Sequence, residues 1–201
     1  PSLVMEGYTV IANELLEQFT RIKKWPSHVF IQAGVGGLAA SMAYMIREYW
    51  QQQPEIIVVE SELAPCLQTS HRKGASTTVK GAVSIMGRLD CKAPSLVAFN
   101  ALERAHVDYL PISDKESLDA TRILQDKNIS TTPSGAAGLA GLLKMYKTEK
   151  IKKFFIIYEQ FTIENEMLTP TLKLKRYKII NGIGFINDIS VINTSQSRYR
   201  F

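Results

Sequence analysis

The stretch from His28 to Trp50 constrains the fold of this chain more than any other part of it. A run rich in β-branched and aromatic residues, 28–33, ends in glycines at positions 34, 36 and 37, and a helix-forming segment, 38–50, follows directly. Glycine lets a turn adopt positive φ and leaves no Cβ between backbone N–H groups and a ligand. The N-terminus of the following helix adds unpaired N–H groups and a partial positive charge. The pattern predicts either an anion-binding cradle suited to phosphate, or a tight βα turn that needs glycine for its geometry alone.

The remaining pattern places this turn in an α/β fold with a parallel sheet flanked by helices. Apolar runs at 55–60 and 108–112 are typical of strands. Ser113, with Glu116 three positions later, forms a capping box at the start of a helix. Strands and helices alternate, which favours parallel pairing. Ligands of such sheets bind beyond the carboxyl ends of the strands, where we expect the glycine turn and the segment 134–138 to lie together.

Composition narrows the classes of function. The chain has 201 residues, 45% hydrophobic and 21% charged, as in soluble globular proteins, and it contains no apolar run long enough to span a membrane. Residues 1–148 carry a net charge of +1 and residues 149–201 one of +4, but no nucleic-acid-binding motif accompanies these basic residues.

Cys66 and Cys91 form neither a metal-spaced cluster nor a disulfide framework, so we expect a reducing, cytoplasmic setting. Because the chain opens with Pro1 rather than Met, we also expect it to be the interior of a longer protein.

Five motifs in register carry a resemblance to a known family. They are Met5–Val10, Gln32–Leu38, Val59-Glu60 followed by Ala64–Cys66, Met86–Cys91, and Ser134–Gly138. In this order they resemble fold-type II pyridoxal-phosphate enzymes, the tryptophan synthase β-like superfamily. The likeness is greatest to diaminopropionate ammonia-lyases and threonine-dehydratase-like proteins, and it covers residues 3–147. It implies a partial domain of that fold, an amino-acid substrate, the cofactor pyridoxal 5'-phosphate, and the homodimer typical of the family.

The resemblance also implies roles for individual residues. Ser134 and Gly135 would lie near the cofactor ring or the substrate, although Ser134 also suits a helix N-cap. Glu60 matches a glutamate that helps to hold a cation in some relatives. Cys66 replaces the partner carboxylate here, so contact with backbone amides is the alternative, and we expect no metal. Asp90 is a candidate acid or base, with a loop or capping role as the alternative. The backbone amides that would hold the cofactor phosphate are those of Gly34, Val35, Gly36, Gly37 and Leu38.

Two features of the family have no counterpart in this chain. No lysine lies in the Ser/Asn-x-Lys context of the family's Schiff-base lysine, and nothing after Thr148 matches the residue that bonds the pyridine nitrogen. We therefore expect no catalytic residue within this chain and no activity from it alone. Residues 154–178 resemble instead the C-terminal motif of long-chain acyl-CoA synthetases, with Lys173 at the position that contacts the acyl-adenylate.

These observations predict three segments and leave three functions open. The segments are a partial lyase-like domain (1–148), an acyl-CoA-synthetase-like segment (149–178) and an irregular, non-homologous tail (179–201). The leading hypothesis is a fragment of a pyridoxal-phosphate-dependent ammonia-lyase that catalyses α,β-elimination on an amino acid to give a 2-oxo acid. The alternatives are a fragment of a fatty-acid-activating synthetase and a non-catalytic module that binds a phosphate-bearing ligand.

Overall fold

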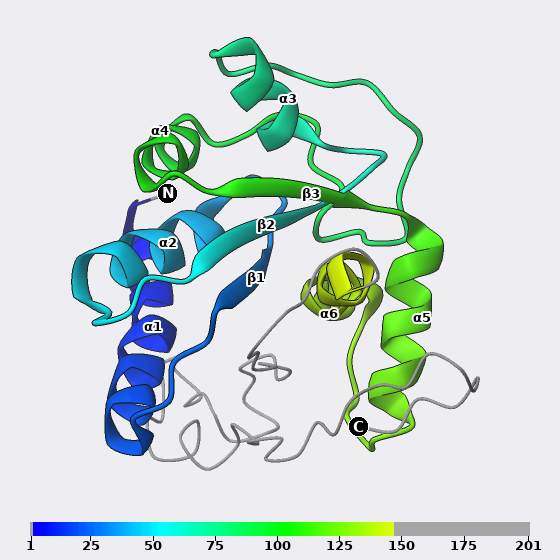
Figure 1. Ribbon diagram of the computed structural model, residues 1–201. Helices are drawn as coiled ribbons and strands as arrows, with labels where there is room; N and C mark the ends of the chain where they lie inside the picture. The colour runs from blue at the N-terminus through cyan, green and yellow to red at the C-terminus, as the bar shows by residue number, and fades with distance from the viewer. Residues whose placement is uncertain (1, 147–201) are drawn as a thin grey trace. The chain divides into compact units, whose positions relative to one another are not determined.

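Three parallel strands form one sheet in the order β1-β2-β3 (Figure 1). The computed structural model describes residues 2–146. Within this range the strands are β1 (His28–Gln32), β2 (Glu55–Ser61) and β3 (Asp108–Ile112). Strand β1 pairs with β2 from His28 opposite Glu55, and β2 pairs with β3 from Ile57 opposite Asp108. The parallel α/β fold expected from the sequence is confirmed.

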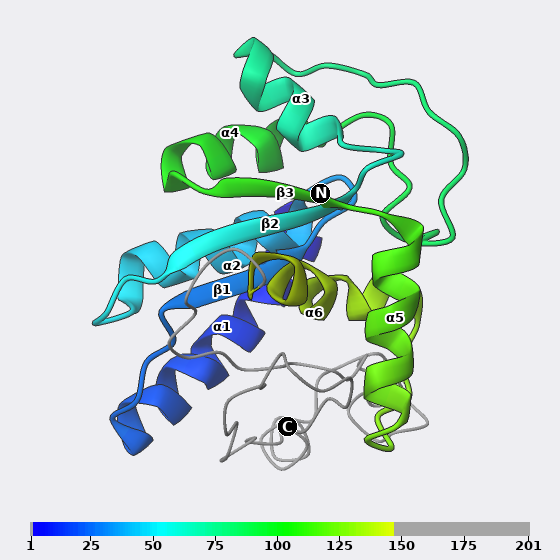
Figure 2. The ribbon, with the colours of Figure 1, turned by 45° about the vertical axis from the view of Figure 1, so that its right-hand side comes forward.

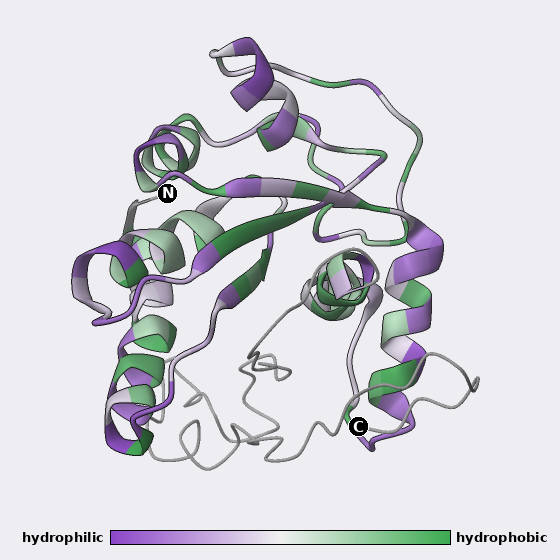
Figure 3. Ribbon diagram, in the orientation of Figure 1, coloured by the Kyte–Doolittle hydropathy of each residue, from purple (hydrophilic) through white to green (hydrophobic). Residues whose placement is uncertain are grey.

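The central strand β2 carries the core of the sheet. Its residues from Ile56 to Ser61 are all buried, and it is hydrophobic along most of its length (Figure 3). Such a continuous apolar run is typical of a strand covered on both faces.

Helices cover both faces of the sheet (Figures 1 and 2). Helices α2 and α4 lie on one face, with α1 packed against α2, while α6 crosses the other face and packs against α5. The short helix α3 lies near β3 and α4. The helices are α1 (Ser2–Ile22), α2 (Gly37–Tyr49), α3 (Cys66–Lys73), α4 (Leu96–Ala105), α5 (Asp114–Gln125) and α6 (Pro133–Tyr146).

The ends of the helices follow the signals in the sequence, with one exception. The capping box of Ser113 and Glu116 begins α5, and Ser95 caps α4. Helix α1, however, begins at Ser2, whereas the sequence predicts an amphipathic helix over 9–24 from the apolar residues Val10, Leu15, Leu16, Phe19 and Ile22. The Ser41 hydroxyl of α2 donates to the Met5 carbonyl at 2.8 Å, a tertiary contact that supports the first turns.

None of the helices between residues 2 and 146 combines the length and apolar character that crossing a bilayer requires. The acyl-CoA-synthetase-like segment, the irregular tail and the domain boundaries predicted after residue 148 lie outside the described residues.

Candidate functional site

The glycine turn lies between the carboxyl end of β1 and the N-terminus of α2, as the sequence predicts. Gly36 directly precedes α2 with φ 98° and ψ −1°, in the left-handed region. A Cβ at this position would meet Ala98 Cβ and Leu67 Cδ1 at 3.2 Å. The left-handed φ therefore favours glycine at position 36, and a Cβ there would also be in tight contact with both neighbours.

The first turn of α2 is open to an anion. Gly36 provides no side chain to cap the helix, so the N–H groups at its N-terminus donate to no capping side chain of this residue. Gly37 and Leu38 are half-buried, and the nearest atom to a Cβ at Gly37 would be Met5 Cγ at 3.6 Å. Unpaired N–H groups and the positive end of the helix dipole suit a phosphate group.

The loop 86–95 runs along the other side of the glycine turn. A Cβ at Gly34 would lie 2.7 Å from the Arg88 carbonyl oxygen and 2.8 Å from Cys91 Sγ. The Ser95 N–H donates to the Val35 carbonyl at 2.9 Å. Burial and the charge of Asp90 raise the pKa of the Cys91 thiol, and a backbone hydrogen bond from Val35 opposes them. Of the five amides assigned to the cofactor phosphate, that of Val35 therefore already faces a protein atom.

Ser134 reaches the same loop from the opposite face of the sheet. Its side chain is 6% exposed, and its Oγ accepts the Arg88 N–H at 3.2 Å. Thr132, rather than Ser134, provides the N-cap contact of α6, because the Gly135 N–H donates to Thr132 Oγ1 at 3.2 Å. Arg88 thus touches Gly34 through its carbonyl and Ser134 through its N–H. The glycine turn and the segment 134–138, which the sequence predicts to lie together, thus both contact Arg88. The residue itself was not among those predicted for the site.

Glu60 is fully buried at the end of β2 and faces the N-terminus of α3. Its two carboxylate oxygens accept the N–H groups of Leu67 and Gln68, each at 2.8 Å. Burial raises the pKa of Glu60 to about 7, while these N–H groups and the Cys66 thiol favour the charged form. The geometry matches the alternative of contact with backbone amides. Among residues 2–146, no group of three or more His, Cys, Asp or Glu side chains is placed to hold a metal ion.

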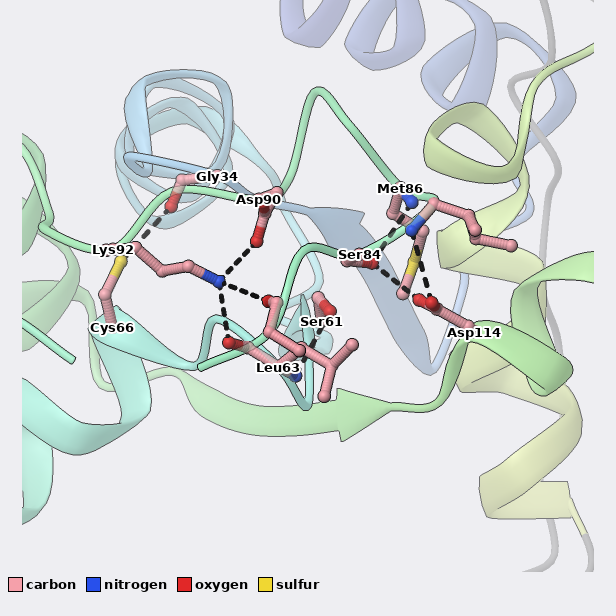
Figure 4. Close-up of polar contacts among 11 residues, drawn as sticks. Gly34, Ser61, Leu63, Cys66, Ser84, Met86, Asp90, Lys92 and Asp114 are labelled. Carbon is pink, nitrogen blue, oxygen red and sulfur yellow. Dashed lines mark hydrogen bonds and ion pairs between the residues drawn. The ribbon is translucent and has the colours of Figure 1, made fainter. Parts of the chain in front are cut away.

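Asp90 belongs to a polar tie that fixes the long loop between α3 and α4 (Figure 4). Lys92 Nζ lies 2.5 Å from Asp90 Oδ1 and donates to the carbonyls of Leu63 and Ala82, each at 2.9 Å. A second tie joins Ser84 Oγ to Asp114 Oδ1 at 2.6 Å. These contacts favour the loop role of Asp90. Lys92 was not among the residues predicted for the site, although an opposite charge two positions from Asp90 is a signal for such a pair.

A phosphate-bearing ligand therefore fits the donors present here: an uncapped helix N-terminus beside two glycines, Gly34 and Gly36, at which a Cβ would make tight contacts. This combination lies at the carboxyl edge of a parallel sheet, which is where ligands of α/β domains bind. The chain belongs to the family of pyridoxal-phosphate dependent enzymes, whose family model matches residues 1–155. The family resemblance drawn from the five motifs is thus confirmed.

Individual relatives support the same assignment. Diaminopropionate ammonia-lyase of Escherichia coli is 31% identical over 153 residues, which are 73% of this chain and 38% of that protein. A crystal structure of the Escherichia coli enzyme is 30% identical, with a TM-score of 0.62, and the match covers 71% of this chain and 38% of that one. The fold of a threonine deaminase (T.th.) matches with a TM-score of 0.70 at 24% identity, over 75% of this chain and 56% of that one. This chain spans 38% of the length of the curated ammonia-lyase that it matches.

Proposed function

We propose that residues 2–146 form the phosphate-binding part of a pyridoxal-phosphate-dependent ammonia-lyase, of the type that removes ammonia from an amino acid by α,β-elimination to leave a 2-oxo acid. The observation that carries the proposal is the left-handed Gly36 at the uncapped N-terminus of α2. The family match and the ammonia-lyase relative support the reaction class.

In this proposal the backbone N–H groups of Gly36, Gly37 and Leu38 hold the cofactor phosphate, with Gly34 and Val35 completing the turn. Ser134 and Gly135 border the ring or the substrate, and Arg88 fixes their position relative to the turn. The cofactor, when bound, supplies the electron sink on which such eliminations depend. The residues of this chain bind the cofactor phosphate and orient the cofactor ring or the substrate.

The catalytic lysine is not assigned to this chain. Lys92 follows Cys91 in the loop that contacts Gly34, and its ammonium group already bonds to Asp90, Leu63 and Ala82. Deprotonating Lys92 to make it a nucleophile would remove its ion pair with Asp90 and leave two donors for three acceptors. We therefore expect the chain alone to bind the cofactor without a covalent link.

Pyridoxine 5'-phosphate is the probe that tests binding, because it carries the phosphate but has no aldehyde to react with surface lysines. We expect calorimetry to give an affinity at least about tenfold higher for this probe than for pyridoxine, because the charge-assisted bonds to phosphate are lost in the latter. Equal affinities would exclude the phosphate-binding function.

A second measurement separates a lyase fragment with a missing lysine from a chain that carries its own. After incubation with pyridoxal phosphate and borohydride, labelling spread over many exposed lysines supports the proposal. Stoichiometric labelling of one lysine, abolished by its replacement with arginine, would contradict it.

A further inference from the structure

Arg88 lies on a short, well-anchored turn at the start of the loop 86–95. The N–H groups of Leu89 and Asp90 both donate to the Met86 carbonyl, at 2.7 and 3.0 Å. The side chains of Met86 and Leu89 are buried on either side of the turn, whereas Arg88 is exposed. The two buried side chains therefore fix the turn and leave the arginine side chain at the surface.

The backbone of Arg88 lies between the two segments assigned to the cofactor and the substrate. Its N–H donates to Ser134 Oγ at 3.2 Å, and its carbonyl oxygen lies 2.7 Å from the point where a Gly34 Cβ would be. Ser134 is itself buried. The main chain of Arg88 is thus held beside the proposed site by contacts on both sides, and such support positions a residue that selects a ligand.

The guanidinium group of Arg88 is available to a ligand. Within residues 2–146 the structure gives it neither a hydrogen bond nor an ion pair. Two nearby carboxylates already have partners, since Asp90 is paired with Lys92. The other, Asp114, accepts the hydroxyl of Ser84 at 2.6 Å. An unpaired cation near the positive end of α2 favours a ligand that carries a second negative group besides its phosphate.

We propose that Arg88 is a specificity-determining residue of the lyase site and binds a carboxylate on the side chain of the substrate. This inference rests on the proposed function and names its substrate class: an amino acid whose side chain carries a carboxylate in addition to the group that is eliminated. A planar guanidinium binds a carboxylate through two parallel N–H···O bonds. A substrate whose side chain bears an ammonium group would be repelled instead.

Stable adducts of the cofactor with amino acids test the proposal on the full chain. N-(5'-phosphopyridoxyl)-L-aspartate carries the phosphate, the ring and a side-chain carboxylate, but no group that can be eliminated. The asparagine adduct has nearly the same shape without the side-chain charge, and the 2,3-diaminopropionate adduct carries an ammonium group. In calorimetry at low salt we expect the aspartate adduct to bind at least about tenfold more tightly than the asparagine adduct, and the diaminopropionate adduct to bind most weakly.

Substitutions at position 88 separate the role of the side chain from that of the backbone. Arg88→Gln keeps the N–H and the carbonyl, so it should bring the affinities of the aspartate and asparagine adducts to within about twofold of each other and leave that for pyridoxine 5'-phosphate unchanged. Arg88→Lys retains the charge without the planar donor pair and should keep part of the preference. Arg104→Gln is the matched control, because this exposed arginine lies in the last turn of α4, whereas Ser95 at the other end of α4 contacts the glycine turn. It should change none of the affinities.

Three results would overturn this inference alone, with pyridoxine 5'-phosphate still bound by the wild-type chain. They are equal affinities for the three adducts, a preference for the aspartate adduct that persists in Arg88→Gln, and an Arg88→Gln variant that loses pyridoxine 5'-phosphate as well. The last of these would assign the arginine to the cofactor phosphate. If the wild-type chain binds neither the adducts nor pyridoxine 5'-phosphate, the proposed function fails and this inference fails with it.

Discussion

The carboxylate of Glu60 accepts the N–H of Leu67 at 2.8 Å, so a fully buried acid at the end of β2 holds the N-terminus of α3. Its pKa is raised to about 7 by burial, from an ordinary value of 4.5. The folded chain therefore binds a proton at Glu60 between these two pH values, whereas the unfolded chain releases it.

This shift predicts how stability depends on pH. Because the folded state holds the extra proton, the contribution of Glu60 to the free energy of unfolding is greatest below about pH 4.5. It falls by about 3 kcal/mol as the pH rises to 7. For Glu60→Gln we expect the free energy of unfolding, measured by urea denaturation at several pH values, to lose this decrease between pH 4.5 and 7. Glu62→Gln, at an exposed position just past the end of β2, is the control and should keep the slope. An unchanged slope in Glu60→Gln would mean that Glu60 titrates normally.

Gly36 and Gly74 form a matched pair for testing the glycine turn. Both have positive φ, but a Cβ at Gly74 would meet nothing within 4 Å, whereas one at Gly36 would press on Ala98 and Leu67. We expect Gly74→Ala to cost roughly 1 kcal/mol of stability and Gly36→Ala roughly 2–4 kcal/mol. Calorimetry with pyridoxine 5'-phosphate should show weaker binding only for Gly36→Ala. Equal affinity in Gly36→Val and the wild type, at a temperature where both are folded, would refute the assignment of the phosphate site.

The roles of Ser134 and Thr132 can be distinguished, because each hydroxyl oxygen accepts a different backbone N–H. Ser134→Ala removes the acceptor of the Arg88 N–H, and Thr132→Ala removes that of the Gly135 N–H. We expect each variant to lose about 1 kcal/mol of stability. In hydrogen-exchange measurements, exchange of the Arg88 amide should accelerate in Ser134→Ala and not in Thr132→Ala. An unaffected Arg88 amide in Ser134→Ala would show that this bond does not hold the loop.

Lys92→Met tests the tie that fixes the loop between α3 and α4. The variant deprives two carbonyls and the Asp90 carboxylate of their shared donor, so we expect a loss of roughly 1–2 kcal/mol in urea denaturation. Lys80→Met, an exposed lysine of the same loop, should change stability by less than about 0.5 kcal/mol. The double variant Lys92→Met with Asp90→Asn should lose less than the sum of the two single variants, because the residues share one interaction. Full additivity would show that the pair contributes nothing.

The sequence predicted the parts of the fold that local patterns determine. The strand 108–112 and the capping box of Ser113 and Glu116 are confirmed, because a β-rich run and a capping motif act within a few residues. The turn at Gly36 has the positive φ that its glycine suggested.

The parts that the sequence could not predict depend on contacts between distant segments. Nothing local marks Arg88 as the residue that touches both Gly34 and Ser134, because these are backbone contacts that any residue could make. The early start of α1 has the same cause, since its first turns bond to Ser41 of α2. The contacts of Cys66 and Cys91 with Gly34 also follow from the folded course of the chain rather than from their spacing.

The bond between Arg88 and Ser134, which are 46 positions apart, has a consequence for the order of folding. Protein synthesis delivers the glycine turn first, the loop 86–95 later and α6 last among these three. The strand pair and the turn at Gly36 can form while the chain is still emerging from the ribosome, but the loop gains its anchor on α6 only after Ser134 has left the exit tunnel. Because such long-range contacts form slowly, we expect the loop 86–95 to take its final position beside the glycine turn in the last stage of folding.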